Sequence, residues 1–401
     1  MSQSLVLLLS LFAAAASQNS SKQEGGVQSP KFTAEVLFVG EGSGDMPIWH
    51  FTAVNDEGEL VGVSRNDLDH AVILAQGGKA GYSENLDWMA TRWRLGRDAE
   101  LRSNALIFPG FSESHVVGIN SEGVMVGFAE KEDLIGDAFR VLAFLHAENG
   151  TITDISALSS MRNCWPKAIN DRGDVVGDAS NDPGPFSWSA RYHTSAFHWS
   201  PSGEFRVLPA PQGATNIKAV ALSKDGLIAG ECESANYSGR RVVVWQGNEV
   251  LELPEVGGHA YCRAGDINDR GDIVGYSMES PCDSGGETRP LLWTRDHYGT
   301  FRGRDLGFEG TAIGINSQGW VVGTRTDCAG GQRCAALYLR EGRWSDKGIA
   351  LDLNDLVLPT EDWIAGKLRL VEALDLTDTG MILCRAWKRG ANWAYVLLNK
   401  V

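Results

Sequence analysis

Seven side chains at equivalent positions of a repeated pattern could act together in ligand binding or in acid–base chemistry. Each stands three residues before the first position of a ten-residue repeat, and the seven are His50, His115, Trp165, Lys218, Arg263, Thr311 and Glu372. Histidine and glutamate are residue types that commonly transfer protons in general acid–base catalysis. If the strands that carry these residues line a common channel, we expect a polar ring at its mouth. If they do not, the same side chains simply begin their strands in solvent.

Three further residues could contribute to a binding surface. His259 could join the ring, although a histidine in a loop commonly faces solvent. Trp188 and Tyr192 lie in a long polar segment, where an aromatic side chain can either stack on a ligand or pack against the protein. The tryptophans that recur in one predicted strand of the repeat are instead expected in the core: Trp199, Trp245 and Trp293.

The sequence contains no established catalytic or cofactor motif in a suitable context. It has no Gly-x-Ser-x-Gly elbow, phosphate-binding glycine loop or dinucleotide fingerprint, and no Cys/His spacing typical of zinc. The repeated Asn-Asp-x-Gly-Asp turn has some similarity to a calcium loop, but it lacks the alternating carboxylates and the closing Glu. We therefore expect no cofactor, with calcium as the alternative, and we name no catalytic residue and no metal ligand. The tripeptides Arg172-Gly173-Asp174 and Arg270-Gly271-Asp272 are explained by the repeat, without an adhesion role.

The residues singled out above are positioned by seven copies of the repeat. Ala53–Gly62, Ala168–Gly177 and Asp266–Gly275 are the clearest copies, and the others are Gly118–Gly127, Ala221–Gly230, Gly314–Gly323 and the degenerate Asp375–Cys384. In each copy an apolar residue precedes a turn of the Asn-Asp-x-Gly type, and Val-Val-Gly or a similar run follows. Asn and Asp favour such turns, and glycine adopts positive φ without a Cβ clash. Each copy therefore predicts a β-hairpin.

Further strands follow most of the predicted hairpins. A third strand is predicted at His70–Leu74 in the first copy and at Ser195–Trp199 in the third, and a glycine turn and a fourth strand usually come next. The last copy has only three strands, while residues 34–39 form an unpaired strand before the first copy. We therefore predict an all-β protein, a β-propeller of seven four-stranded blades in which the N-terminal strand completes the last blade.

The N-terminus predicts export. Residues 1–17 have the length and composition of a signal peptide, too short to span a bilayer, and residues 18–30 are typical of a flexible leader. Residues 31–401 then form one domain in an extracellular or periplasmic setting. Seven cysteines leave at least one unpaired, and the best disulfide candidate is Cys328 with Cys334, which could clip a hairpin loop.

The charge balance argues against polyanionic partners. With 36 Lys and Arg against 51 Asp and Glu, the formal net charge is −15. Such a chain lacks the positive charge with which proteins neutralise phosphates. We therefore expect no nucleic-acid partner and no stable membrane insertion, and we expect a monomer.

The repeats resemble those of the HAF repeat family, which are bacterial and mostly exported proteins. Their repeats are approximately Ala-x-Ala-Ile-Asn-Asp-x-Gly-x-Val-Val-Gly followed by His-Ala-Phe-Leu-Trp, and the resemblance covers about residues 45–401. His70-Ala71-Val72 and Ala196-Phe197-His198-Trp199 are nearest to the naming triad, and Trp393–Leu398 looks like the closing strand; the copies at Ala221–Gly226 and Leu376–Gly380 depart from the pattern. The resemblance implies a propeller-like domain in an extracellular or envelope setting, and it carries no catalytic motif.

Two functions from different classes are consistent with the sequence. The first is an exported, non-catalytic binding or scaffold module for a glycan, a peptide or an envelope protein. Its ligand surface would lie on the face opposite the repeat turns, where the long segments 130–138, 181–194, 231–239, 278–287 and 327–333 gather. The alternative is a secreted hydrolase or lyase with a polar site at the channel mouth, formed by His50, His115, Arg263 and Glu372.

Overall fold

The computed structural model shows an all-β protein. It describes residues 29–39, 49–65, 88–95, 101–106, 108, 111, 113–131, 140–181, 193–234, 239–256, 258–280, 286–328, 332–342, 345, 347–360, 363, 366–389 and 391–401. The predicted signal peptide and most of the predicted leader lie outside these residues. Among the described residues, two 3₁₀ helices accompany the strands, η1 (Ser156–Leu158) and η2 (Leu353–Asp355). In the part of the chain so described, no helix has the length and hydrophobicity needed to cross a lipid bilayer.

The strands form units of four that follow one another along the chain. Units 1 to 3 contain β2 (Trp49–Val54), β3 (Leu60–Arg65), β4 (Trp88–Leu95), β5 (Leu101–Leu106); β6 (Glu113–Ile119), β7 (Met125–Lys131), β8 (Arg140–His146), β9 (Ile152–Asp154); and β10 (Asn163–Ile169), β11 (Val175–Ser180), β12 (Ser195–Trp199), β13 (Phe205–Val207). Units 4 to 6 contain β14 (Ala214–Leu222), β15 (Ile228–Ser234), β16 (Arg240–Gln246), β17 (Glu249–Glu252); β18 (Tyr261–Ile267), β19 (Ile273–Met278), β20 (Thr288–Arg295), β21 (Phe301–Asp305); and β22 (Gly310–Ile315), β23 (Val321–Arg325), β24 (Cys334–Arg340), β25 (Gly348–Asp352). Unit 7 contains β26 (Leu368–Leu376), β27 (Ile382–Lys388), β28 (Ala391–Lys400) and the N-terminal β1 (Phe32–Val39).

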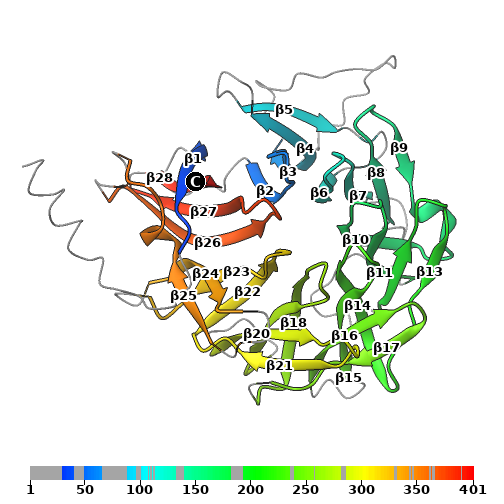
Figure 1. Cartoon of the computed structure of the whole chain (residues 1–401). Helices are drawn as coiled ribbons and strands as arrows, with labels where there is room; N and C mark the ends of the chain where they lie inside the picture. The colour runs from blue at the N-terminus through cyan, green and yellow to red at the C-terminus, as the bar shows by residue number, and fades with distance from the viewer. Residues whose placement is uncertain are drawn as a thin grey trace, which may run out of the picture.

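Units 4 and 5 form one eight-stranded sheet rather than two separate sheets. A single parallel pair, Arg240 with Tyr261, joins β16 to β18, whereas all pairing inside each unit is antiparallel. In Figure 1 the chain colour runs around the molecule, so that the red β27 and β28 lie beside the blue β1. β1 pairs with β28 from Phe32 opposite Lys400 to Val39 opposite Ala394, as predicted from the unpaired strands at the two ends of the chain.

The first hairpin of every unit has the predicted turn. The central glycines all have positive φ, between 72° and 89°, and they are Gly58, Gly123, Gly173, Gly226, Gly271, Gly319 and Gly380. A register shift lies just before the repeat in all seven units, for example between Phe51 and Ala53. This bulge brings the first strand very close to the glycine that ends the repeat. A Cβ on that glycine would lie between 1.9 and 2.1 Å from a backbone oxygen of the first strand at Gly62, Gly127, Gly177, Gly230, Gly275 and Gly323.

The repeat asparagines connect neighbouring units. Asn120 Oδ1 accepts hydrogen bonds from two backbone N–H groups of its own turn, while its Nδ2 donates to the backbone oxygen of Asn170 in the next unit, at 3.2 Å. The same inter-unit bond is made by Asn55, Asn170, Asn268 and Asn316. Units 4 and 5 are joined instead by the Lys224 N–H and Asp269 Oδ1, at 2.8 Å. In these five units one asparagine side chain thus shapes the turn and links it to the next unit.

The core lies between adjacent units. Trp199, Trp245 and Trp293 are all buried, as expected. Trp245 Nε1 donates to the backbone oxygen of Pro209, which precedes unit 4, and Trp293 Nε1 donates to that of Pro254, which precedes unit 5. Each of these tryptophans packs with apolar residues of its own unit and of a neighbouring unit. The core therefore fixes the order of the units.

One predicted strand was wrong. The third strand of unit 1 is β4 (Trp88–Leu95), which pairs with β3 from Leu60 opposite Trp93 to Arg65 opposite Trp88. The predicted third strand, His70–Leu74, lies outside the described residues. Trp93 is fully buried in the position that Trp199 and Trp245 occupy in other units, so burial of a large aromatic side chain decided which segment pairs.

Candidate functional site

The predicted polar ring lies on the first strand of each unit, near the end opposite the repeat turns. We call this end the loop side and the other end the turn side. The structure brings His50 and Glu372 into one cluster at the junction of units 7 and 1, which we call the seam cluster; its other members are Arg385, Trp393 and Tyr395. His50 Nδ1 lies 3.1 Å from the Tyr395 hydroxyl oxygen. Arg385 forms an ion pair with Glu372, and its Cζ lies 4.9 Å from the centre of the Trp393 ring.

The electrostatics of the seam cluster keep His50 neutral at pH 7. Burial lowers the pKa of His50, and the positive charge of Arg385 lowers it further. Burial raises the pKa of Tyr395, so its hydroxyl stays protonated as well. Because Glu372 is engaged with Arg385, the cluster offers a set of neutral or internally paired hydrogen-bonding groups.

His115 and Trp165 meet at Phe128, away from the seam cluster. The His115 ring stacks on Phe128 with 4.8 Å between ring centres, and its Nε2 lies 3.3 Å from Glu113 Oε2. Burial lowers the pKa of His115 although Glu113 favours the charged form. Trp165 is buried against Val141 and Phe128, which makes it a packing residue between units 2 and 3.

The other predicted site residues are held within single units. Lys218 is half-buried opposite Glu231 on β15, Arg263 lies opposite Tyr276, and Thr311 lies opposite Thr324. His259 Nδ1 lies 3.1 Å from Ser277 Oγ, beside β18. Trp188 and Tyr192 lie outside the described residues, as do large parts of the long loop-side segments. Whether the seven positions bind one ligand therefore stays a prediction.

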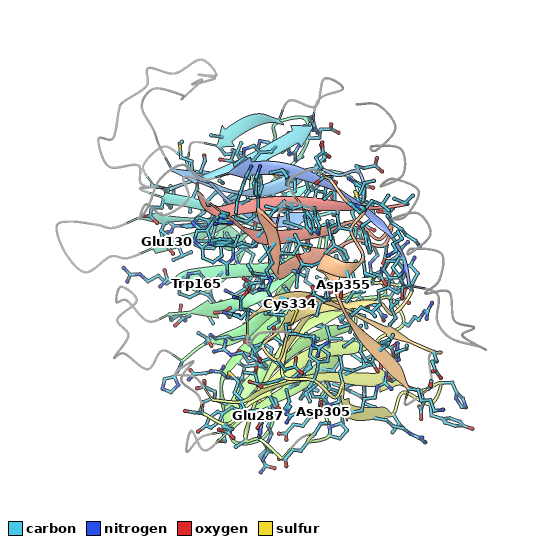
Figure 2. All side chains as sticks on the ribbon, turned by 90° about the vertical axis from the view of Figure 1, so that its left-hand side faces the viewer. Glu130, Trp165, Glu287, Asp305, Cys334 and Asp355 are labelled. Carbon is cyan, nitrogen blue, oxygen red and sulfur yellow. A yellow bond between two sulfur atoms is a disulfide. The ribbon has the colours of Figure 1, made fainter. Side chains whose placement is uncertain are left out.

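The described cysteines offer no accessible thiol. Cys328 and Cys334 form a disulfide with a Cα–Cα distance of 6.3 Å, and Figure 2 places Cys334 well inside the outline of the molecule. Burial raises the pKa of Cys164, Cys232 and Cys262 to about 11, and raises that of Cys384 as well. A thiolate nucleophile needs a lowered pKa and exposure to substrate. These four thiols are packing residues.

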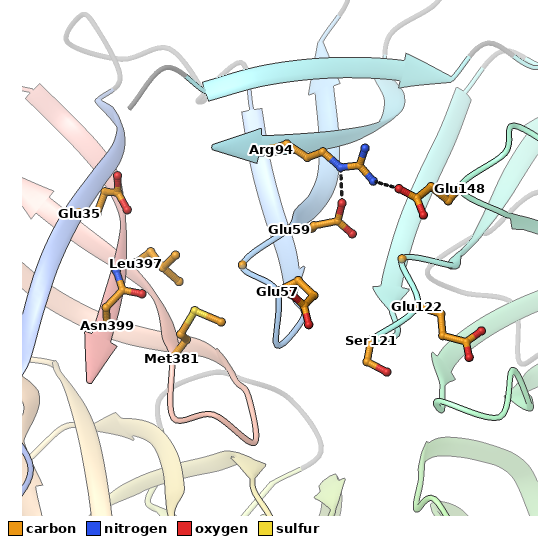
Figure 3. A pocket seen from close by; sticks show the side chains of 12 residues that line it. Glu35, Glu57, Glu59, Arg94, Ser121, Glu122, Glu148, Met381, Leu397 and Asn399 are labelled. Atoms are coloured by element: carbon orange, nitrogen blue, oxygen red, sulfur yellow. Dashed lines mark hydrogen bonds and ion pairs between the residues drawn. The ribbon is translucent and has the colours of Figure 1, made fainter. Parts of the chain in front are cut away.

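A cavity of about 630 Å³ opens on the turn side, where the sequence did not predict a site. We call it the turn-side cavity. It is bounded by β1 and β28 of unit 7, by the turns of units 1 and 2, and by the β8–β9 hairpin (Figure 3). Its lining residues are Glu35, Glu57, Gly58, Glu59, Arg94, Ser121, Glu122, Gly123, Glu148, Met381, Leu397 and Asn399. The lining thus contains five glutamates and one arginine, and Met381 and Leu397 form its apolar wall.

The positive charge in the turn-side cavity is already engaged. Arg94 forms ion pairs with Glu59 and, at 2.9 Å, with Glu148 (Figure 3). Glu59 also accepts a hydrogen bond from Asn55 Nδ2 at 3.1 Å, which fixes it to the turn. Glu35 lies on the opposite wall, and partial burial raises its pKa. The arrangement leaves an excess of carboxylates around an apolar wall, and a positively charged ligand would relieve that excess.

The sequence carried a weak signal for this cavity. Copies 1 and 2 have Glu57 and Glu122 at the variable turn position, where copies 3 and 5 have arginine. This difference concentrates negative charge at two adjacent turns. Outside these two turns, the lining residues come from β1, β4, β28, the β8–β9 hairpin and the β26–β27 turn, far apart in the sequence, so only the fold brings them together.

Comparisons with known proteins find similarity among solved structures only. No protein-family model and no curated protein sequence matches the chain. Among solved structures, the chain is similar to an acylaminoacyl peptidase from Pyrococcus horikoshii, with a TM-score of 0.50 and 12% identity over 86% of this chain and 50% of that one. It is also similar to TolB from Acinetobacter baumannii (TM-score 0.41, 12% identity, 73% of this chain and 65% of that one) and to the Dos1 propeller (TM-score 0.45, 9% identity, 91% and 94%).

These similarities concern the fold alone, because the identities are so low. The chain spans about half the length of the peptidase and 65% of TolB. The class that the fold defines is an all-β, propeller-like protein built from four-stranded units.

Proposed function

We propose that this chain is an exported, non-catalytic binding module, and that it binds a positively charged peptide segment of a partner protein in the turn-side cavity. The observation that carries the proposal is the cavity itself: about 630 Å³, with five glutamates around Met381 and Leu397. A cavity of this size accommodates a few side chains. Lysine and arginine suit it because their aliphatic stems can lie on the apolar wall while their charges reach the carboxylates.

We also propose that the scaffold is a closed propeller of seven blades. The support is the series of hydrogen bonds between successive turns, from Asn55 to Asn316, together with the bond from the Thr379 N–H to Asp56 Oδ1, at 2.9 Å, between units 7 and 1. The pairing of β1 with β28 supports the same closure. We also propose, from the sequence alone, that the chain is a member of the HAF repeat family and that it is exported.

The chemistry of the described residues favours binding over the hydrolase or lyase alternative. Of the residues that form the polar site of this alternative, Glu372 is paired with Arg385, and His115 is stacked on Phe128. Neither arrangement positions a base against an activated nucleophile, which hydrolysis through a covalent intermediate requires.

The test is calorimetric titration of the full chain with three decapeptides that differ only in four positions, which carry lysine, glutamine or glutamate. We expect the lysine peptide alone to bind measurably. The double variant Glu57→Gln/Glu122→Gln should weaken its binding by about tenfold or more, which corresponds to about 1.4 kcal/mol.

The matched control is Glu204→Gln, which removes an exposed carboxylate from the β12–β13 hairpin of unit 3. It should leave the affinity unchanged. Equal binding of the lysine and glutamine peptides would overturn the proposal, as would an equal effect of the control variant.

A further inference from the structure

The loop-side end of unit 7 presents aromatic side chains to solvent. Trp387 on β27 is 44% exposed and Trp393 on β28 is 36% exposed. The β27–β28 connection consists only of Arg389 and Gly390, whereas the corresponding connections of the other units are longer. The short connection leaves both indoles without cover from their own hairpin.

Trp393 lies on the face of unit 7 that turns toward unit 1, and Trp387 lies beside it in the β27–β28 ladder. Leu383 on β27 packs with Phe51 of unit 1, and alternate residues of a strand share a face, so Arg385 follows Leu383 on that side. Trp387 is opposite Arg369 on β26 and lies at an irregularity of the β27–β28 register, between Ala386 opposite Ala394 and Lys388 opposite Ala391. Trp393 shares the face because it stacks on Arg385. The junction between the units is therefore apolar toward the turn side, and aromatic and polar toward the loop side.

Hydrogen-bonding groups lie beside Trp393. Arg385 lies over Trp393 and is ion-paired with Glu372, and Tyr395 contacts His50 across the junction. The Arg385–Glu372 pair supplies donors and acceptors side by side but no net charge, and Arg369 adds one positive charge at the edge of the surface, opposite Trp387. His50 adds no charge at neutral pH, because burial and Arg385 lower its pKa.

We infer that this surface, formed by Trp387, Trp393 and the polar groups of Arg385, Glu372, His50 and Tyr395, is a binding site for a neutral glycan. A pyranose ring has an apolar C–H face that packs on an indole, and its neighbouring hydroxyls both donate and accept hydrogen bonds. The paired guanidinium and carboxylate match such hydroxyls. A few polar groups placed beside aromatic side chains are typical of small-ligand sites. The site lies at the opposite end of the unit 7–unit 1 junction from the turn-side cavity and does not depend on the function proposed for that cavity.

The test measures binding of four hexasaccharides to the full chain by calorimetry and by saturation-transfer NMR. Three are neutral, namely cellohexaose, maltohexaose and N-acetylchitohexaose, and the fourth, hexagalacturonic acid, is anionic. We expect at least one neutral hexasaccharide to bind with a Kd below about 1 mM, the range of modest non-covalent affinity. Trp393→Ala and Trp387→Ala should each weaken that binding by about tenfold or more, and Trp393→Phe should retain part of it.

Tyr298→Ala is the matched control, because it removes an 82% exposed aromatic side chain from the β20–β21 hairpin of unit 5. It should bind the hexasaccharide as the unaltered chain does. Thermal unfolding of each variant shows whether it is folded. If Trp393→Ala does not fold, Trp387→Ala still tests the binding site. The inference is overturned if no neutral hexasaccharide binds, if hexagalacturonic acid binds more tightly, or if neither tryptophan variant weakens binding. Binding of the lysine decapeptide should be the same in both tryptophan variants, so failure here is distinguishable from failure of the proposed peptide site.

Discussion

The carboxylate of Asp375 accepts a hydrogen bond from the backbone N–H of Val54, with 2.8 Å between Oδ2 and N. This bond joins the last unit to the first. Asp266 makes the equivalent bond from unit 5 to the Ile315 N–H of unit 6, at 3.0 Å. The other five copies have alanine or glycine at this position. Two junctions are thus linked by a buried carboxylate that the other copies lack.

The Asp375 carboxylate should make stability depend on pH. Burial raises its pKa from 3.8 to about 6, despite hydrogen bonds from the Val54 and Leu376 N–H groups. Between these two values the folded state holds a proton that the unfolded state releases, so the free energy of unfolding should fall as pH rises from about 4 to about 6. In Asp375→Asn that component should vanish. Its loss should appear as a flatter slope in urea unfolding measured at several pH values, smaller by up to about 1.4 kcal/mol per pH unit.

Asp266 provides the comparison for this experiment. Burial raises its pKa to about 7, so Asp266→Asn should flatten the slope over a range that extends to higher pH. An unchanged slope in both variants would show that the two carboxylates stay ionised in the fold.

Replacement of a repeat asparagine should lower the free energy of unfolding by more than the loss of its two hydrogen bonds within the turn would explain. Asn120 is buried and makes two bonds within its turn and one to unit 3, so Asn120→Ala should lower the free energy of unfolding by about 2–4 kcal/mol. Asp296 accepts the same two local bonds in a surface hairpin. Asp296→Ala should therefore cost under about 1 kcal/mol. Equal losses in chemical denaturation would argue against a contribution from the inter-unit bond.

The last glycine of the repeat should not accept a side chain. A Cβ on Gly275 would lie 2.0 Å from the backbone oxygen of Arg263, which is too close for any side-chain rearrangement to relieve. We expect Gly275→Ala to destabilise the protein by at least about 3 kcal/mol, or to prevent soluble expression. Gly342→Ala is the control, since no atom lies within 4 Å of its Cβ position. A Tm for Gly275→Ala within a degree or two of the control would contradict the close approach.

Binding in the turn-side cavity should strengthen as pH rises. Partial burial raises the pKa of Glu35, and a bound ammonium group favours its ionised form, so binding should release a proton. The affinity of the lysine decapeptide should therefore increase from pH 5 to pH 7, and Glu35→Gln should reduce the increase. Calorimetry in two buffers of different ionisation enthalpy measures the proton release directly. Identical pH profiles for the two proteins would exclude Glu35 from the site.

Features that depend on interactions within a few residues could be predicted from the sequence, and features that depend on contacts between distant segments could not. The seven turns could be predicted because positive φ at Gly58 and its equivalents is a local requirement that appears in every copy. The third strand of unit 1 could not, because two apolar segments competed and burial of Trp93 decided between them. The ring positions were found by alignment of the copies, but their neighbours were not, since Arg385 and Tyr395 belong to other strands.

The sequence by itself determined the repeating hairpin and the all-β class, because turn chemistry and strand alternation act over a few residues. It also determined the pairing of the chain ends, because the last copy lacks a strand and residues 34–39 supply one. Only the tertiary structure decided which units touch and which charges gather. The turn-side cavity combines β1, β4, β28 and four turns, and the seam cluster combines β2, β26, β27 and β28. Both depend on how the units pack against one another, and packing between segments hundreds of residues apart leaves no local pattern in the chain.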